Sequence, residues 1–167
     1  MKTIKKYPPR KILLETFIYE DGKIFWRQNK GKNITSGKEA GRVSNKGYFR
    51  VCINRKEYLR SRIIYIMHNG DIPFGLLIDH KNEIKHDDRI DNLRLSNNSQ
   101  NKNNSGKRKT NKSGYKGVSW KSANNKYKSQ SLVNGQVKYL GLFNTPEDAH
   151  KAYSMAAKKY HGVFAHY

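Results

Sequence analysis

The sequence predicts an α+β protein with a β-rich N-terminal region and a C-terminal three-stranded antiparallel sheet packed on one helix. Three observations lead to this prediction. Residues 17–26 and 47–60 each show two short apolar runs around turn residues, as hairpins do. Residues 113–163 show three strand-like runs and then an apolar repeat of three and four, which is typical of a helix. Residues 102–112 hold no acid and no large apolar residue, so they are predicted to be a linker.

Local signals define the elements of the N-terminal region. Asp21-Gly22 is a strong two-residue hairpin turn, and residues 54–56 separate the second pair of strands. A short helix is expected over residues 61–68, because Ser61 can cap its start and Asn69-Gly70 offers a left-handed stop. These elements are predicted to form the packing framework of the region.

The C-terminal unit is predicted from three strands, at residues 115–121, 126–133 and 136–143. Thr145 can cap the helix that follows, with Pro146 at its first position and two acids in its first turn. Its apolar stripe is rich in alanine, so the helix can lie close to the sheet. The opposite face of the sheet is then left open.

Charge narrows the class of partner. The chain of 167 residues carries 34 Lys and Arg against 13 Asp and Glu, a formal net charge of +21. Such an excess opposes compaction unless a polyanion neutralises it, and nucleic acid is the commonest such partner. A basic ribosomal or RNA-associated protein remains an alternative. Membrane binding is disfavoured, because the basic residues are spread over the chain and no long amphipathic segment gathers them.

Cysteine usage and hydropathy indicate the compartment. Cys52 is the only cysteine, which excludes an intrachain disulfide and a cysteine-rich zinc site. The longest apolar run, residues 63–67, is too short for a signal peptide or a membrane span. A soluble protein of the cytoplasm is therefore expected.

One stretch has the layout of a reactive site. A short apolar strand leads directly into Asp79 and His80, and a polar loop of eleven residues separates His80 from Asn92. Residues 93–96 alternate like a second strand, and a short polar helix that contains Asn101 can start near Asn97. A strand, loop, strand and helix in this order can bring the four polar side chains to one point. Taken singly, each has a plainer interpretation as a turn, cap or hydrogen-bonded residue.

This stretch resembles the HNH (His-Me finger) nuclease motif, in the form found in phage and intron-encoded homing endonucleases. The resemblance implies a ββα-metal nuclease core. It assigns His80 as general base, with Asn92 fixing the loop and the imidazole. Asp79 and Asn101 would be the metal ligands. Asp88 is assigned to bracing the loop, with metal binding as the alternative, and the remaining histidines are interpreted as structural or surface groups.

The implied chemistry suits these residue types. Phosphodiester hydrolysis needs a base for the attacking water, and an imidazole with an ordinary pKa of about 6.5 serves near neutral pH. It also needs positive charge at the crowded phosphate, which a hard divalent cation on oxygen ligands supplies. Two oxygen ligands, completed by DNA phosphate and water, favour Mg²⁺ or Mn²⁺ over zinc.

The C-terminal unit resembles the Apetala/ethylene-response-factor type of DNA-binding domain, through Tyr115-Lys116-Gly117-Val118, Tyr139-Leu140-Gly141 and Glu147-Asp148-Ala149. The resemblance implies that the sheet, not the helix, enters the major groove. The matching groove-facing positions are Lys116, Ser119, Lys121, Gln130 and Tyr139. From the basic linker we add three further candidate DNA contacts, Lys107, Arg108 and Lys109.

The sequence therefore predicts an HNH homing-type endonuclease of phage or intron origin. Its expected parts are a nuclease domain at 1–101, a basic linker at 102–112 and an Apetala-type domain at 113–167. It would cleave double-stranded DNA with Mg²⁺ or Mn²⁺, leaving 5′-phosphate and 3′-hydroxyl ends. A monomer would nick one strand and a homodimer could cut both. No small-molecule substrate is expected. The main alternative is a DNA-binding regulator with an inactive nuclease-like site.

Overall fold

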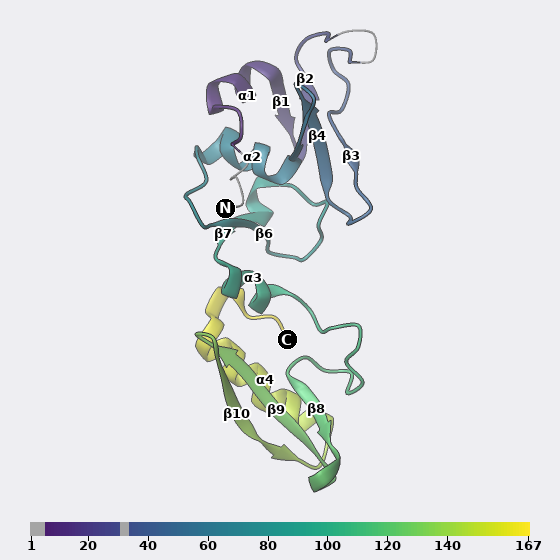
Figure 1. The fold of residues 1–167 in the computed structure, drawn as a ribbon, viewed down its shortest axis with the longest axis vertical. Coiled ribbons are helices and arrows are strands. Elements are labelled where there is room, and N and C mark those ends of the chain that lie inside the picture. Colours follow the sequence, from purple (N-terminus) through teal and green to yellow (C-terminus); the bar gives the residue numbers. More distant parts are fainter. Residues whose placement is uncertain (1–5, 31–33) are drawn as a thin grey trace. The chain divides into compact units, whose positions relative to one another are not determined.

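The structure is a computed structural model that describes residues 6–30 and 34–167 (Figure 1). The chain forms two compact units, which meet in sequence between Leu95 and Ser96. Both mix helices with small sheets, so the α+β class predicted from the sequence is confirmed. Within the described residues, no helix has the length and apolar character needed to cross a bilayer.

The first unit contains the predicted hairpins. Asp21 and Gly22 form the turn of the first one, and both have positive φ. Asn54 and Arg55, also at positive φ, form the turn of the second. The elements of this unit are α1 (Arg10–Thr16), β1 (Phe17–Glu20), β2 (Lys23–Trp26), β3 (Arg42–Val43), β4 (Phe49–Ile53), β5 (Lys56–Leu59), α2 (Arg60–Asn69), β6 (Leu77–His80) and the start of β7 (Leu93–Ser96).

A compact core joins these elements. β1 pairs with β2, β4 pairs with β3 and β5, and β6 pairs with β7. α2 ends at Gly70, whose φ of 81° is the left-handed stop expected from the sequence. The largest apolar side chains with no exposed surface come from α1, both hairpins and α2: Leu13, Phe17, Ile24, Val51, Ile63 and Ile64. β6 packs against this core through Ile78.

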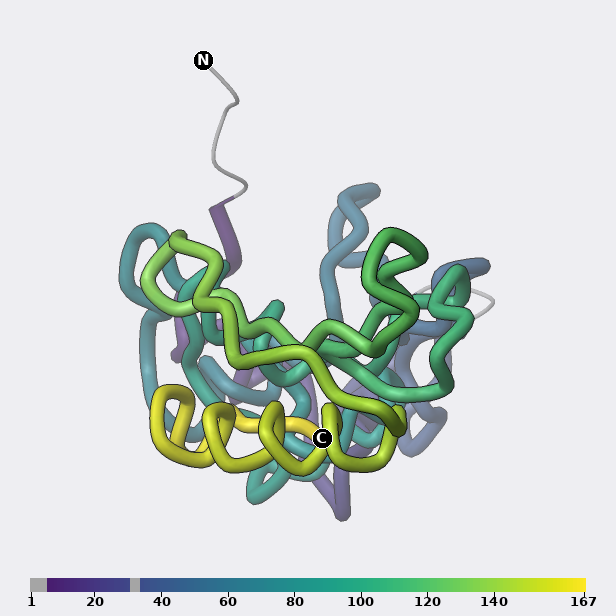
Figure 2. The backbone as a smooth tube through the Cα atoms, turned by 90° about the horizontal axis from the view of Figure 1, so that it is seen from below, coloured from purple at the N-terminus to yellow at the C-terminus, as the bar shows by residue number. Residues whose placement is uncertain are grey.

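The second unit packs one long helix on a three-stranded sheet. It contains α3 (Asn98–Asn104), β8 (Val118–Lys121), β9 (Lys126–Val133), β10 (Gln136–Phe143) and α4 (Pro146–His161). The sheet order is β10-β9-β8, with antiparallel neighbours. Figure 2 shows α4, in yellow, running along one side of these strands. Its buried side chains Ala149, Tyr153, Ala156 and Ala157 form the expected packing stripe.

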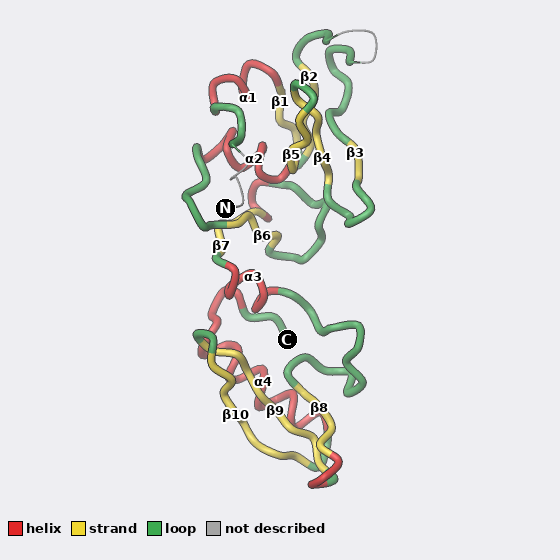
Figure 3. Tube along the Cα trace, viewed as in Figure 1, coloured by secondary structure: helices red, strands yellow, loops and turns green. Residues whose placement is uncertain are grey.

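Two boundaries in this unit differ from the sequence prediction. The strand expected from Tyr115 begins at Val118, because Asn111 and Ser113 bond the carbonyls of Tyr115 and Val118 and hold a compact loop. The segment predicted as a linker from residue 102 contributes its first three residues to α3. Figure 3 shows the long loop between α3 and β8. The division into domains 1–101, 102–112 and 113–167 stays a prediction.

Candidate functional site

Asp79 and His80 lie at the end of β6, and both are buried, with 4% and 6% of their surface exposed. β6 pairs with β7, and the backbone N–H of Lys81 donates to the carbonyl of Asn92 at 2.9 Å. The polar loop between them is thus closed at its base. The sequence prediction of two strands that flank a polar loop is confirmed.

A chain of buried charges holds the imidazole of His80. Its Nε2 lies 2.8 Å from Oδ1 of Asp88, and Nε of Arg60 donates to the other carboxylate oxygen at 2.7 Å. Arg60 also donates to Glu39 at 2.7 Å, and its guanidinium lies over the ring of Phe49. Asp88 is 2% exposed and Arg60 is 2% exposed, so this ion pair is shielded from water.

This arrangement sets the tautomer of His80. A carboxylate held by a guanidinium only accepts hydrogen bonds, so the contact requires a hydrogen on Nε2. In the neutral ring the lone pair is then on Nδ1, which is the nitrogen able to accept a proton. The geometry therefore favours the form of His80 that can act as a base.

Asn92 organises the loop that carries Asp88. Its amide oxygen accepts from the backbone of Asn82 at 3.1 Å, and its amide nitrogen donates to the carbonyl of Asp87 at 2.7 Å. The guanidinium of Arg89 donates two hydrogen bonds to Asp87, and these hold the pKa of that carboxyl well below its usual value. The loop is therefore fixed by side chains on both sides of Asp88. The effect of Asn92 on the imidazole stays a prediction.

The first hairpin supports the same loop. The phenol oxygen of Tyr19 accepts from the backbone N–H of Ile90 at 3.1 Å. At the turn, a Cβ added to Gly22 would lie 2.8 Å from the backbone nitrogen of Arg89. Only a glycine allows this approach, and its φ of 81° favours glycine as well.

The two predicted metal ligands lie on different elements. Asp79 accepts from Nε of Arg94 at 2.9 Å, within the first unit. Asn101 lies in α3 of the second unit, whose first turn is held by a capping box between Asn97 and Gln100. A carboxylate and an amide supply the oxygen donors that Mg²⁺ and Mn²⁺ prefer, so the residue types fit such an ion. Their joint coordination of a cation stays a prediction.

Four of the predicted DNA contacts share one face of the second sheet. Ser119 and Lys121 alternate on β8, and the registered pair Gln130–Tyr139 continues the same face. Lys128, opposite Ser119, joins them and was missed by sequence reasoning. The helix side of the sheet holds the buried residues Val118, Ser129 and Ser131. The open face is thus polar and basic around β8, and it carries the exposed apolar pair Leu132 and Val137 at its other end.

The other predicted DNA contacts lie before β8. Nζ of Lys116 donates to the carbonyl of Asn103 at 2.6 Å, and Nζ of Lys107 donates to that of Gly114 at 2.8 Å. Arg108 and Lys109 are exposed on the loop between α3 and β8. Lys107 and Lys116 therefore have ordered positions inside the second unit.

Sequence reasoning also missed Arg60 as a support of His80. It assigned Asp88 only to bracing the loop or to a metal. The available signal was weak: an acid eight residues after the histidine, and an arginine at the junction of a strand and a helix. Neither Arg60 nor Asp88 can be predicted from its neighbours to form a buried ion pair, because the two residues come from distant parts of the chain.

Comparisons with known proteins agree with the class that this geometry indicates. Residues 58–103 match the model of the family described as HNH endonuclease. The predicted enzyme class is thereby confirmed. The match includes Arg60, Asp79, His80, Asp88 and Asn92. No curated protein matches the chain.

One solved structure is similar, described as "DNA binding and cleavage by the HNH homing endonuclease I-HmuI". It is 22% identical to this chain, with a TM-score of 0.45. The similarity covers 60% of this chain and 57% of the other, so the chain matches little more than half of that structure's length.

Proposed function

We propose that the protein is a metal-dependent, site-specific HNH homing endonuclease that hydrolyses phosphodiester bonds in double-stranded DNA. The observation that carries this proposal is the imidazole of His80, fixed through Nε2 by the buried Asp88–Arg60 pair within the HNH segment. The high positive charge supports a polyanionic substrate. Action in the cytoplasm of a bacterial host, and an origin in a phage or intron, are part of the same proposal.

In this mechanism Nδ1 of His80 takes a proton from the attacking water, and Asp88 balances the charge that forms on the ring. Asp79 and Asn101 would hold the cation, as the ββα-metal core of the HNH motif implies. A bound divalent ion would stabilise the charge on the phosphate and on the leaving oxygen. Breaking the bond between phosphorus and the 3′ oxygen leaves 5′-phosphate and 3′-hydroxyl ends.

The second unit would extend the contact with DNA as an Apetala-type domain. Ser119, Lys121, Gln130 and Tyr139 share the open sheet face, which would enter the major groove. Lysine there can contact guanine or phosphate, and glutamine can contact adenine. Lys107, Arg108, Lys109 and Lys116 would add phosphate contacts. Affinity should then fall steeply with salt, because counterions are released from the DNA.

The test is conversion of supercoiled plasmid with Mg²⁺ or Mn²⁺. His80→Ala should lower the cleavage rate by about 10²–10⁴-fold, the usual contribution of a general base, and retain DNA binding. His86→Ala is the matched control, because His86 is an exposed histidine in the same loop. Undiminished cleavage by His80→Ala would contradict the assignment. The proportion of nicked and linear product separates a nicking monomer from a dimer that cuts both strands.

One contact favours a second candidate, a DNA-binding regulator with an inactive nuclease-like site. Arg94 donates to Asp79, so a guanidinium already lies on the carboxylate assigned to the metal. A divalent ion would have to share that carboxylate with Arg94. Purified protein that binds duplex DNA but leaves plasmid intact at every metal concentration would support the regulator.

A further inference from the structure

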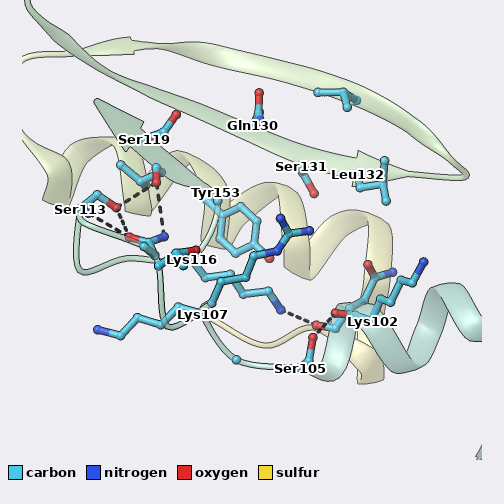
Figure 4. A pocket seen from close by; sticks show the side chains of 18 of the residues that line it. Lys102, Ser105, Lys107, Ser113, Lys116, Ser119, Gln130, Ser131, Leu132 and Tyr153 are labelled. Atoms are coloured by element: carbon cyan, nitrogen blue, oxygen red, sulfur yellow. Dashed lines mark hydrogen bonds between the residues drawn. The ribbon is translucent and has the colours of Figure 1, made fainter. Parts of the chain in front are cut away.

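The second unit contains a cavity of about 830 Å³ between its sheet, α3 and the loop that joins α3 to β8. Figure 4 shows Lys107 and Lys116 within it, below the ring of Tyr153, and Lys102 at the end formed by α3. The volume falls in the range of about 300–1,000 Å³ that is typical of small-ligand pockets. A double helix, whose major groove alone is about 12 Å wide, does not fit such a space.

Positive charge dominates the walls of this cavity. The described residues that line it include five cationic side chains and no acid: Lys102, Lys107, Arg108, Lys112 and Lys116. Burial raises the pKa of Tyr153, another lining residue, to about 12, so its hydroxyl adds no negative charge near neutral pH. The chemistry of the lining therefore selects an anion.

Two of the cations are held in place before any ligand arrives. Lys116 and Lys107 each donate to a backbone carbonyl, at 2.6 and 2.8 Å. The hydroxyl of Ser113 anchors the same loop through the carbonyls of Tyr115 and Val118. An ammonium with three donors can keep such a bond and still face a phosphate. Because the groups are already ordered, binding costs less side-chain entropy.

The cavity also has an aromatic and apolar wall. Trp120 lines it and is 50% exposed, and its ring is held by an edge contact with Tyr127, with centroids 4.8 Å apart. Leu132 and Val137 line the cavity too, but the strand register places them on the open face of the sheet and Trp120 on the helix face. The ring of Trp120 is therefore the surface that a base beside the lysines can use. A site for inorganic phosphate alone has no use for such a surface. A base attached to a phosphate does, because bases stack on aromatic rings.

We propose that this cavity binds a single unpaired nucleotide of a DNA strand, with its phosphate on the lysines and its base against the ring of Trp120. The inference rests on the proposed function, since it assigns a second, strand-reading role to the unit that contacts duplex DNA. The open sheet face contacts the paired duplex, and the adjoining cavity, which shares Ser119 and Gln130 with that face, takes a base that has left the stack.

The first test compares an intact short duplex with the same duplex carrying one unpaired thymidine. Binding is followed by fluorescence anisotropy with the metal chelated, so that no cleavage occurs. Base–aromatic stacking is worth about 1–3 kcal/mol, so the wild type should bind the bulged duplex roughly 5- to 150-fold more tightly. Trp120→Ala should abolish this preference and leave affinity for the intact duplex unchanged.

Tyr139→Ala is the matched control, because Tyr139 is an exposed aromatic residue on the open face and 59% accessible. It should weaken binding to both duplexes and keep their ratio. Equal binding of the two duplexes by the wild type would overturn the cavity proposal and leave the nuclease proposal intact. A preference that survives Trp120→Ala would also overturn it. Loss of all duplex binding, by contrast, would count against the proposed function.

A second test uses small ligands on the full chain. Trp26 is buried in the first unit and Trp120 is half exposed, so changes in tryptophan emission report mainly on Trp120. Thymidine 3′,5′-bisphosphate should quench the emission, and Trp120→Phe should remove that response. Inorganic phosphate and thymidine are tested separately, to distinguish binding of the phosphate from binding of the base. If inorganic phosphate alone quenches the emission as strongly as the bisphosphate does, the cavity is a simple anion site and the proposal fails.

Discussion

Two histidines, one in each unit, occupy opposite electrostatic settings. His80 contacts the carboxylate of Asp88 through Nε2. His161 contacts neutral groups, the amide of Asn103 at 3.0 Å and the hydroxyl of Ser131 at 3.1 Å. Burial, and then the charge of Lys116, lower the pKa of His161. One ring has an anion to balance a proton, and the other is kept neutral as a link between α3, β9 and the end of α4.

The comparison shows that the partners of a histidine decide what it can do. In the proposed mechanism, Asp88 lets the buried ring of His80 serve as a proton acceptor, because it fixes the tautomer that leaves the lone pair on Nδ1. The partners of His161 make it a structural connector. Four predictions test this difference, beginning with the largest expected effect.

Removing the guanidinium of Arg60, which holds Asp88 against His80, should lower the unfolding free energy more than any other change. Arg60→Met leaves Asp88 buried without its cation, and breaking such a pair costs about 3–5 kcal/mol of unfolding free energy. Urea unfolding followed by circular dichroism measures the change. Arg42→Met is the control, because the side chain of Arg42 is 82% exposed in its pair with Glu57 and should matter far less. Equal, small changes in both variants would show that the buried pair does not stabilise the fold.

In the second unit, which contains His161, close packing should contribute more to the unfolding free energy than charge does. A Cβ added to Gly117 would lie 2.0 Å from the ring of Tyr153, and the φ of Gly117 is +75°. Gly117→Ala should cost about 1–3 kcal/mol for overpacking, and about 1–2 kcal/mol more for the left-handed backbone. Gly135→Ala, with a φ of +81° and open space around it, should show only the backbone cost. Thermal unfolding of both variants checks the difference, and similar losses would refute the packing explanation.

Asp88→Asn should reduce cleavage by about 10- to 100-fold, the range typical of groups that orient a catalytic residue from behind. Asparagine offers one acceptor oxygen, and Arg60 requires it. The amide nitrogen then faces Nε2 of His80 and favours the tautomer with a hydrogen on Nδ1, which cannot accept a proton. Single-turnover cleavage over a range of pH gives the loss. Duplex affinity should stay at the wild-type level, and a parallel loss of binding would indicate a structural role instead.

The smallest effect concerns pH and His161. Because its pKa is lower in the folded protein, the unfolded chain binds the proton more readily. Its stabilising contribution is full above the ordinary histidine pKa of about 6.5 and is lost as pH falls below that value. His161→Gln should make unfolding temperature less sensitive to pH between neutral and mildly acidic conditions. A variant that keeps the full pH dependence of the wild type would exclude this role.

Prediction from sequence worked where the signal is local. Asp21-Gly22 defines a hairpin, Thr145-Pro146 begins a helix, and Asn97 caps another, because each depends on a few neighbouring residues. It failed where distant segments meet. Arg60 and Asp88 are 28 positions apart and meet only through tertiary packing. The start of β8 was misplaced for a related reason, since side-chain bonds within the preceding loop replace strand pairing.

The contact at Gly22 bears on how such an enzyme can be inherited or engineered. The family segment begins at residue 58, yet a single extra carbon at position 22 would push against the loop that holds Asp88. The smallest part of the chain that could be transferred with its site intact is therefore longer than the matched segment. Recombination or grafting that transplants residues 58–103 must bring the Tyr19–Gly22 hairpin along, or supply an equally flat surface in its place.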